Sequence, residues 1–267
     1  MSEQRAVSRF PYFEALYLAF FSRPFYRNVA LHARGFLLGY LLFMIALLWI
    51  PQMMSIKSEL GDIFAKDAPH YVRQVPEITI KDGRASIKEP VPYMIYREDG
   101  KTPFAVIDTS AQRAPAPGAA YIVVTATDLF IHKNDTGYWG FKLKDFGSDA
   151  TVNRRVIYEW LDAFQSTVPI LLYPFVVVFT FLMYIGLAML TALLGGTMAK
   201  RIGLALDLRG LVRLAVVSYT PALILQAAHA ILEIPFPYSL PVSFAVSIGY
   251  MYYGVLACAE KIVGSEG

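Results

Sequence analysis

The chain has 267 residues, of which 56% are hydrophobic and 17% are charged, and its mean hydropathy is +0.45. This composition is typical of a membrane protein rather than of a soluble domain of the same length. The net charge of +3 is too small to favour nucleic acid as a partner. The single cysteine, Cys258, excludes an intrachain disulfide and a cysteine metal cluster, and we expect it to be a small buried apolar side chain.

The first 34 residues are predicted to lie at a membrane surface. They form too long a lead for a signal peptide, and no A-x-A cleavage site follows the first apolar run. Between residues 11 and 34, aromatic residues are interspersed with Arg23, Arg27 and Arg34, a mixture that suits the lipid headgroup region. We expect one or two interfacial helices here, broken at Pro24, because proline removes a backbone donor.

The longest apolar run extends from Ala163 to Ala199 without a charged residue. About 20 apolar residues are enough to span the hydrocarbon layer of a bilayer as a helix. With three further runs, this pattern predicts an α-helical polytopic membrane protein with four transmembrane helices, at residues 35–52, 166–199, 214–232 and 238–259. Pro169 and Pro174 are expected to bend the second of these helices.

A small antiparallel β domain is predicted between the first and second spans, over residues 53–165. Alternating apolar residues flank Asp82-Gly83, which is a strong hairpin signal, and a second hairpin turn is expected at residues 98–101. Further alternating runs bring the number of predicted strands to six or seven, with the later ones at residues 121–125, 129–132 and 138–143. We expect a short amphipathic helix before the strands and, after them, a helix capped by Ser148 or Asp149 that runs into the second span.

The distribution of basic residues predicts the orientation. Arginines precede the first span, four basic residues lie within the loop at 200–213, and the connection between the third and fourth spans has none. The positive-inside rule therefore places the lead at 1–34, this loop and the tail at 260–267 in the cytoplasm. The β domain is then extracytoplasmic.

The third span carries polar residues on one helical face. Tyr219, Gln226, His229 and Glu233 follow one another at intervals of seven, three and four residues. One interpretation is a path for protons or solutes through the helix bundle. The other is hydrogen bonding between helices, with Glu233 solvated at the outer surface. Hydrogen-bond partners for either interpretation are available in the second span, at Thr180, Tyr184 and Thr191.

Motifs for catalysis are not found in the sequence. It lacks the phosphate-binding loop, the H-E-x-x-H zinc motif, the G-x-S-x-G nucleophile motif and the dinucleotide-binding fingerprint. The four histidines lie in four different segments, so a metal site is not expected. Asp108 with Thr109-Ser110 is interpreted as a strand-end turn. We therefore predict no catalytic residues, no cofactor and no metal.

Three stretches of the sequence resemble one bacterial family. The lead "FFSRPFYRNVALHARGFLLGYLLFMIALL", the outer "FAVIDTSAQ" with "YIVVTATDLFI", and "RLAVVSYTPALIL" in the third span are similar to the family catalogued as domain of unknown function 1189. The resemblance implies a Yip-type multi-span protein of the bacterial inner membrane, but the signature motifs of the trafficking members are missing here. Some relatives lie among maltodextrin-use proteins, which implies an envelope or uptake accessory role. The family has no established catalytic residues to transfer.

Two functions are expected from these features. The first is a non-enzymatic accessory or scaffold protein whose outer β domain binds an envelope or membrane protein, or a second copy of the chain. The alternative is transport or handling of small solutes or lipids through the polar face of the third span. A third hypothesis is a hydrolase, which would need the side chains at 70, 108, 128 and 132 to meet in one cleft.

Overall fold

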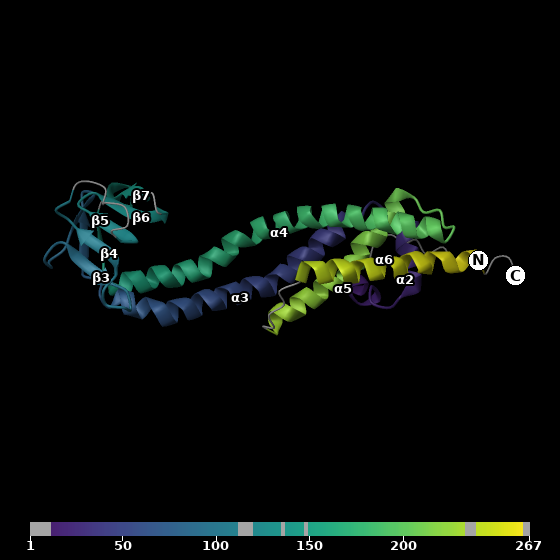
Figure 1. Cartoon of the computed structure of the whole chain (residues 1–267), viewed down its shortest axis with the longest axis horizontal. Helices are drawn as coiled ribbons and strands as arrows, with labels where there is room; N and C mark the ends of the chain where they lie inside the picture. The colour runs from purple at the N-terminus through teal and green to yellow at the C-terminus, as the bar shows by residue number, and fades with distance from the viewer. Residues whose placement is uncertain (1–11, 112–119, 135–136, 147–148, 233–238, 264–267) are drawn as a thin grey trace. The chain divides into compact units, whose positions relative to one another are not determined.

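The computed structural model describes residues 12–111, 120–134, 137–146, 149–232 and 239–263. The chain divides into two compact units, residues 1–56 with 169–267 and residues 57–168, which we call the helical unit and the β unit. The helices are α1 (Tyr12–Leu18), α2 (Arg23–His32), α3 (Leu38–Val72), the 3-10 helix η1 (Leu143–Phe146), α4 (Arg154–Arg201), α5 (Leu208–Ile231) and α6 (Ser239–Val263) (Figure 1). The strands are β1 (Ile78–Lys81), β2 (Arg84–Ser86), β3 (Tyr93–Tyr96), β4 (Pro103–Asp108), β5 (Ile122–Thr125), β6 (Asp128–Asn134), β7 (Gly137–Lys142) and β8 (Asp149–Val152).

Four of these helices are long and apolar enough to cross a membrane, at Leu38–Val72, Arg154–Arg201, Leu208–His229 and Leu240–Ala259. The helix predicted at residues 53–72 is continuous with the first predicted span, because α3 continues through Pro51 to Val72 as one helix. Helix α4 likewise contains Pro169 and Pro174 in its interior. Long apolar helices tolerate internal proline when neighbouring groups satisfy the freed backbone atoms. Proline alone therefore did not mark the helix ends.

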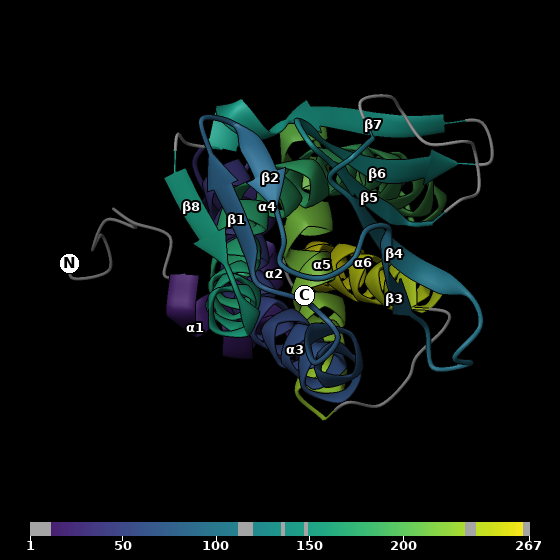
Figure 2. The same cartoon turned by 90° about the vertical axis from the view of Figure 1, so that its left-hand side faces the viewer.

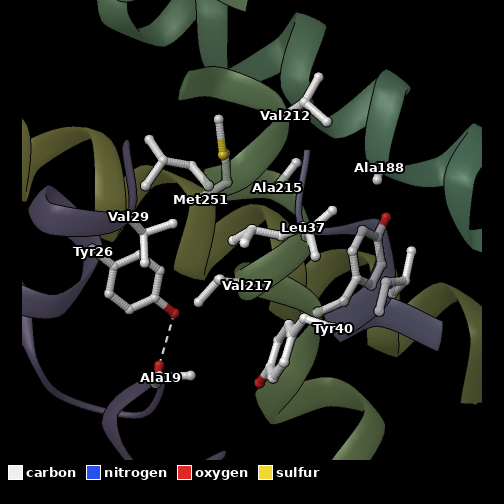
Figure 3. Close-up of a cluster of buried hydrophobic side chains, with 14 of the residues drawn as sticks. Ala19, Tyr26, Val29, Leu37, Tyr40, Ala188, Val212, Ala215, Val217 and Met251 are labelled. Atoms are coloured by element: carbon white, nitrogen blue, oxygen red, sulfur yellow. Dashed lines mark hydrogen bonds between the residues drawn. The ribbon is translucent and has the colours of Figure 1, made fainter. Parts of the chain in front are cut away.

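Helix α5 is the centre of the helical unit. All fourteen residues from Gly210 to Leu223 are buried. A helix that is largely apolar on every side has to be covered on every side. Helices α2 and α6 pack along α5, and hydrogen bonds join it to α3 at Thr220 and to α4 at Tyr219. Figure 3 shows α5 side chains in this core among residues of the surrounding helices.

Helix α2 packs against α5 and α6 through a buried aromatic ring. Tyr26 is fully buried, and its hydroxyl donates to the Ala19 carbonyl at 2.7 Å (Figure 3). A Cβ atom on Gly254 of α6 would lie 2.7 Å from the Tyr26 ring, so the glycine provides the room that the ring occupies. The predicted break in the lead is confirmed, but Pro24 lies in the first turn of α2, where proline is accepted. Ser22 marks the break, because it caps the helix.

Arg213 holds the last turn of α2 against α5. Its Nε donates to the Gly35 carbonyl at 3.0 Å, and its Nη1 donates to the carbonyls of Ala30 at 3.1 Å and Val29 at 3.4 Å. Carbonyls in the last turn of a helix have no partner within the helix and form the negative end of its dipole. The sequence placed Arg213 in a cytoplasmic loop; this is wrong, because α5 already begins at Leu208 and Arg213 is only 8% exposed.

We predict that Arg213→Met destabilises the helical unit by about 2–4 kcal/mol, because it leaves carbonyl groups without their charged donor. The measurement is thermal unfolding of the purified full chain in detergent. Arg209→Met, which removes an exposed arginine from the same helix, is the control and should have little effect. Equal unfolding temperatures for the two variants would contradict this role of Arg213.

The β unit contains a three-stranded sheet in the order β2-β1-β8 and a five-stranded sheet in the order β3-β4-β5-β6-β7 (Figure 2). The hairpin predicted at Asp82-Gly83 is confirmed, and both residues have positive φ, as a two-residue hairpin turn requires. The second predicted hairpin, between β3 and β4, is also confirmed. Its Asp99 carboxylate accepts hydrogen bonds from the side chain and backbone of Thr102 and from the backbone of Lys101, which lower the pKa of Asp99 to about 2.

The prediction of a purely antiparallel β domain is wrong. Strands β4 and β5 are parallel neighbours, with Ala105 opposite Ile122 and Ile107 opposite Val124. Parallel neighbours need a long crossover connection, because the chain has to return to the same end of the sheet. The chain makes this crossover between Asp108, where β4 ends, and Ile122, where β5 begins.

The structure has a strand, β8, at the position where the sequence predicts the start of a helix. Asp149 belongs to β8, which pairs with β1, while Ser148 lies outside the described residues. Asn153 caps α4 instead, since its Oδ1 accepts from the backbone N–H of Val156 at 3.1 Å. From there α4 runs to Arg201, so the expectation that this helix continues directly into the second span is confirmed.

Candidate functional site

Strand β7, at one edge of the five-stranded sheet, carries two exposed aromatic side chains. The cross-strand register forms two apolar rows, Ala105–Ile122–Ile131–Trp139 and Ile107–Val124–Leu129–Phe141. At the β4 end the rows are buried, with Ala105 and Ile107 only 6% and 2% exposed. At the β7 end Trp139 and Phe141 are 53% and 43% exposed. We call Trp139 and Phe141 the β7 face; the sequence predicted their strand but gave no sign that the rows leave the core there.

The residues considered for a hydrolase have separate local partners. The Asp108 carboxylate accepts from the backbone and hydroxyl of Ser110, as in the predicted turn. Asp128 accepts from the Thr127 hydroxyl at 2.6 Å. A ring nitrogen of His70 lies 3.1 Å from the Tyr96 carbonyl oxygen, and His132 packs against the rings of Tyr121 and Tyr138. Within the described residues, no group of three or more His, Cys, Asp or Glu side chains could hold a metal ion.

Tyr219, Gln226 and His229 of the third predicted span lie on α5, where the first two form hydrogen bonds with neighbouring helices. The hydroxyls of Tyr219 and Thr191 are 2.9 Å apart. Gln226 accepts from the Tyr184 hydroxyl at 3.4 Å and donates to Ser243 of α6 at 2.6 Å. Tyr219 and Gln226 are seven residues apart on α5. Their partners on α4, Thr191 and Tyr184, are also seven residues apart but follow the opposite chain direction. Antiparallel α4 and α5 are therefore joined in matching register along one shared face.

The remaining predicted residues of this face are placed differently. His229 lies half-buried on α5, and Glu233 lies outside the described residues. Thr180, named as a partner from the sequence, instead accepts a hydrogen bond from Trp49 of α3 at 3.1 Å. The arrangement at Tyr219 and Gln226 can join helices without any further ligand, since these polar groups already have partners in the bundle.

We predict that the Thr191–Tyr219 contact stabilises the bundle by about 0.6 kcal/mol, the average for hydrogen bonds between membrane helices. A double-mutant cycle with Thr191→Val, Tyr219→Phe and the combined variant measures the coupling through the unfolding of the full chain in detergent. Because the two side chains are in contact and buried, the effects of the two substitutions on the free energy of unfolding should not be additive. A coupling energy indistinguishable from zero would contradict a structural role for this contact.

Comparison with known proteins shows the family. No curated protein and no solved structure matches the chain significantly. The match to a family extends over residues 13–255, which cover most of both units, three of the four long apolar helices completely and the fourth as far as residue 255. The resemblance seen in the sequence is thereby confirmed: the chain belongs to the family described as "Protein of unknown function (DUF1189)".

Proposed function

We propose that this chain is a non-enzymatic accessory protein of the bacterial inner membrane whose β unit binds a protein partner outside the cytoplasm. Four helices with the length and hydropathy of membrane spans support the membrane location. The basic residues of the lead, of the last turn of α4 and of the first turns of α5 support cytoplasmic termini under the positive-inside rule. An even number of crossings agrees with both termini on one side. The Yip-type grouping stays a prediction.

Two of the helices are longer than a bilayer requires. At about 1.5 Å per residue, the 48 residues of α4 correspond to roughly 72 Å and the 35 residues of α3 to roughly 52 Å, against a hydrocarbon layer of about 30 Å. The excess turns of both helices belong to the β unit, where the Phe64 and Phe164 rings pack 6.0 Å apart. These turns give the β unit a paired helical connection to the membrane.

The β7 face is the observation that carries the proposal. Trp139 and Phe141 belong to the same rows as buried core residues, but they are exposed. Apolar surface left in water is unfavourable by about 25 cal/mol per Å² relative to buried surface. Exposed apolar patches mark interaction sites. Tryptophan and phenylalanine are enriched at protein interfaces, and tryptophan is prominent among the residues that contribute most of the binding energy.

The position of β7 in the sheet indicates the type of partner. It is the last strand in the order β3-β4-β5-β6-β7, so one edge of its backbone has no neighbouring strand among the described residues. Such an edge can accept an additional strand from another protein, with main-chain hydrogen bonds giving affinity and alternate side chains giving specificity. An extended segment of an envelope or membrane protein, with apolar residues opposite Trp139 and Phe141, fits this edge.

We predict that Trp139→Ala abolishes recovery of a stoichiometric partner in an affinity pulldown from membranes in mild detergent, because truncating an interface tryptophan costs about 2 kcal/mol or more. Trp160→Ala is the matched control, since Trp160 is 57% exposed on α4, away from the β7 strand. It should recover the partner as the wild type does. Partner recovery unchanged by Trp139→Ala, or repeated recovery of the wild-type chain alone, would contradict the proposal.

Transport through the polar face of α5 stays an alternative hypothesis. Tyr219 and Gln226 are engaged in hydrogen bonds within the bundle, which favours the structural interpretation of these two residues. A transport path would require Gln226→Leu and His229→Leu to abolish flux at normal expression.

A further inference from the structure

A groove of about 1160 Å³ lies in the helical unit between α1, α2 and the turn that leads into α3. One part of its lining is apolar and exposed, with Phe13 from α1 and Phe36 and Leu38 at the start of α3. Another part is polar and consists of exposed side chains, Asn28, His32 and Arg34. The groove is therefore amphipathic. Its volume is somewhat larger than the roughly 300–1,000 Å³ of most small-molecule sites.

The groove lies where polar sequence gives way to a membrane span. Arg34 is the last charged residue before the span-length helix α3, which begins at Leu38, and no other charge follows until Lys57. If α3 crosses the membrane, as the proposed function holds, this end of α3 is at the boundary between lipid headgroups and hydrocarbon. A phospholipid at that boundary presents its phosphate at the level of Arg34 and its acyl chains at the level of Leu38 and beyond.

The electrostatics of the groove leave Arg34 available to a ligand. The negative end of the α2 dipole is close by, but Arg213 already binds the carbonyls of Val29, Ala30 and Gly35 from the buried side. The exposed guanidinium of Arg34 can therefore pair with an external anion, and guanidinium groups bind phosphate oxygens in a bidentate manner. Among the described residues that line the groove, the charged groups are Arg34 and one carboxylate, Glu14 of α1.

We propose that this groove binds one phospholipid with a primary-amine headgroup. The charges of the lining are one positive and one negative, which matches a headgroup that carries a phosphate and an ammonium group. Arg34 binds the phosphate, and Glu14 accepts hydrogen bonds from the ammonium. The acyl chains lie along Phe13, Phe36 and Leu38. This inference rests on the proposed membrane location but not on the proposed partner of the β7 face.

The test is a titration of the purified full chain in detergent with phosphatidylethanolamine and with phosphatidylcholine, in which native mass spectrometry measures the association constant for one lipid. The wild type should bind phosphatidylethanolamine more tightly, because a quaternary ammonium cannot donate hydrogen bonds to Glu14. Arg34→Gln should lower the association constant for both lipids about tenfold, as expected for loss of a charge-assisted hydrogen bond. Glu14→Gln should remove the preference between the two lipids.

Matched variants control for general effects of charge and fold. Arg209→Gln and Glu59→Gln remove exposed charges outside the groove and should bind both lipids as the wild type does. Asn28→Trp fills the groove from an exposed helix position without removing a charge, and it should reduce binding of both lipids. Trp139→Ala, which tests the β7 face, should leave lipid binding unchanged, so failure of the two proposals can be distinguished.

Three results would overturn the inference. One is the same association constant for Arg34→Gln and Arg209→Gln. Another is equal binding of the two lipids by the wild type. The third is displacement of bound lipid by soluble phosphoethanolamine at the same concentration, because a ligand held only by its headgroup would not require the apolar side of the groove.

Discussion

Burial of α5 is the constraint on which the helical unit depends. The stretch from Gly210 to Leu223 has no exposed residue, so the neighbouring helices have to cover all of its sides. Close approach is then needed at several points. On α4, a Cβ atom added to Gly195 would overlap the Met251 side chain of α6, and Gly254 of α6 leaves room for Tyr26. Gly195 and Gly254 are therefore explained by contacts within the chain.

Burial also determines what the polar groups of α5 can do. A hydroxyl or amide without a partner inside a helix bundle is unfavourable, so Thr220 pairs with Tyr40, Tyr219 with Thr191, and Gln226 with Ser243. Arg213 follows the same rule with a full charge, because it binds main-chain carbonyls at the end of α2. Arg213 takes up these carbonyls from the buried side, whereas Arg34 is exposed in the groove.

Local signals made several elements predictable from the sequence. The Asp82-Gly83 turn follows from the ability of these residues to adopt positive φ, and the four apolar helices follow from length and hydropathy. Non-local pairing was not predictable. The strand β8 forms because β1 offers an edge more than 60 residues earlier, and the parallel pairing of β4 with β5 depends on where the crossover returns.

The candidate sites were predictable to a smaller extent. Intervals of seven residues correctly grouped Tyr219 with Gln226, and the partners Tyr184 and Thr191 followed from their place in the preceding span. The β7 face and the groove were missed. The exposure of Trp139 depends on how much of the sheet is covered by the rest of the chain. The groove depends on how α1 and α2 are placed in space. Hydropathy encodes neither of these. A signal for the groove was nevertheless present in Arg34, four residues before the start of an apolar helix.

The central claim is that four crossings leave the β unit outside the cytoplasm, and thiol labelling of intact cells tests it most directly. Because Cys258 is the chain's single cysteine, Cys258→Ala provides a background into which one new cysteine at a time can be introduced. With a membrane-impermeant maleimide, the account predicts labelling of Lys101→Cys in the exposed β3–β4 turn, and labelling of Arg201→Cys at the end of α4 only after permeabilisation. The reverse pattern, or labelling of both positions from the same side, would contradict it.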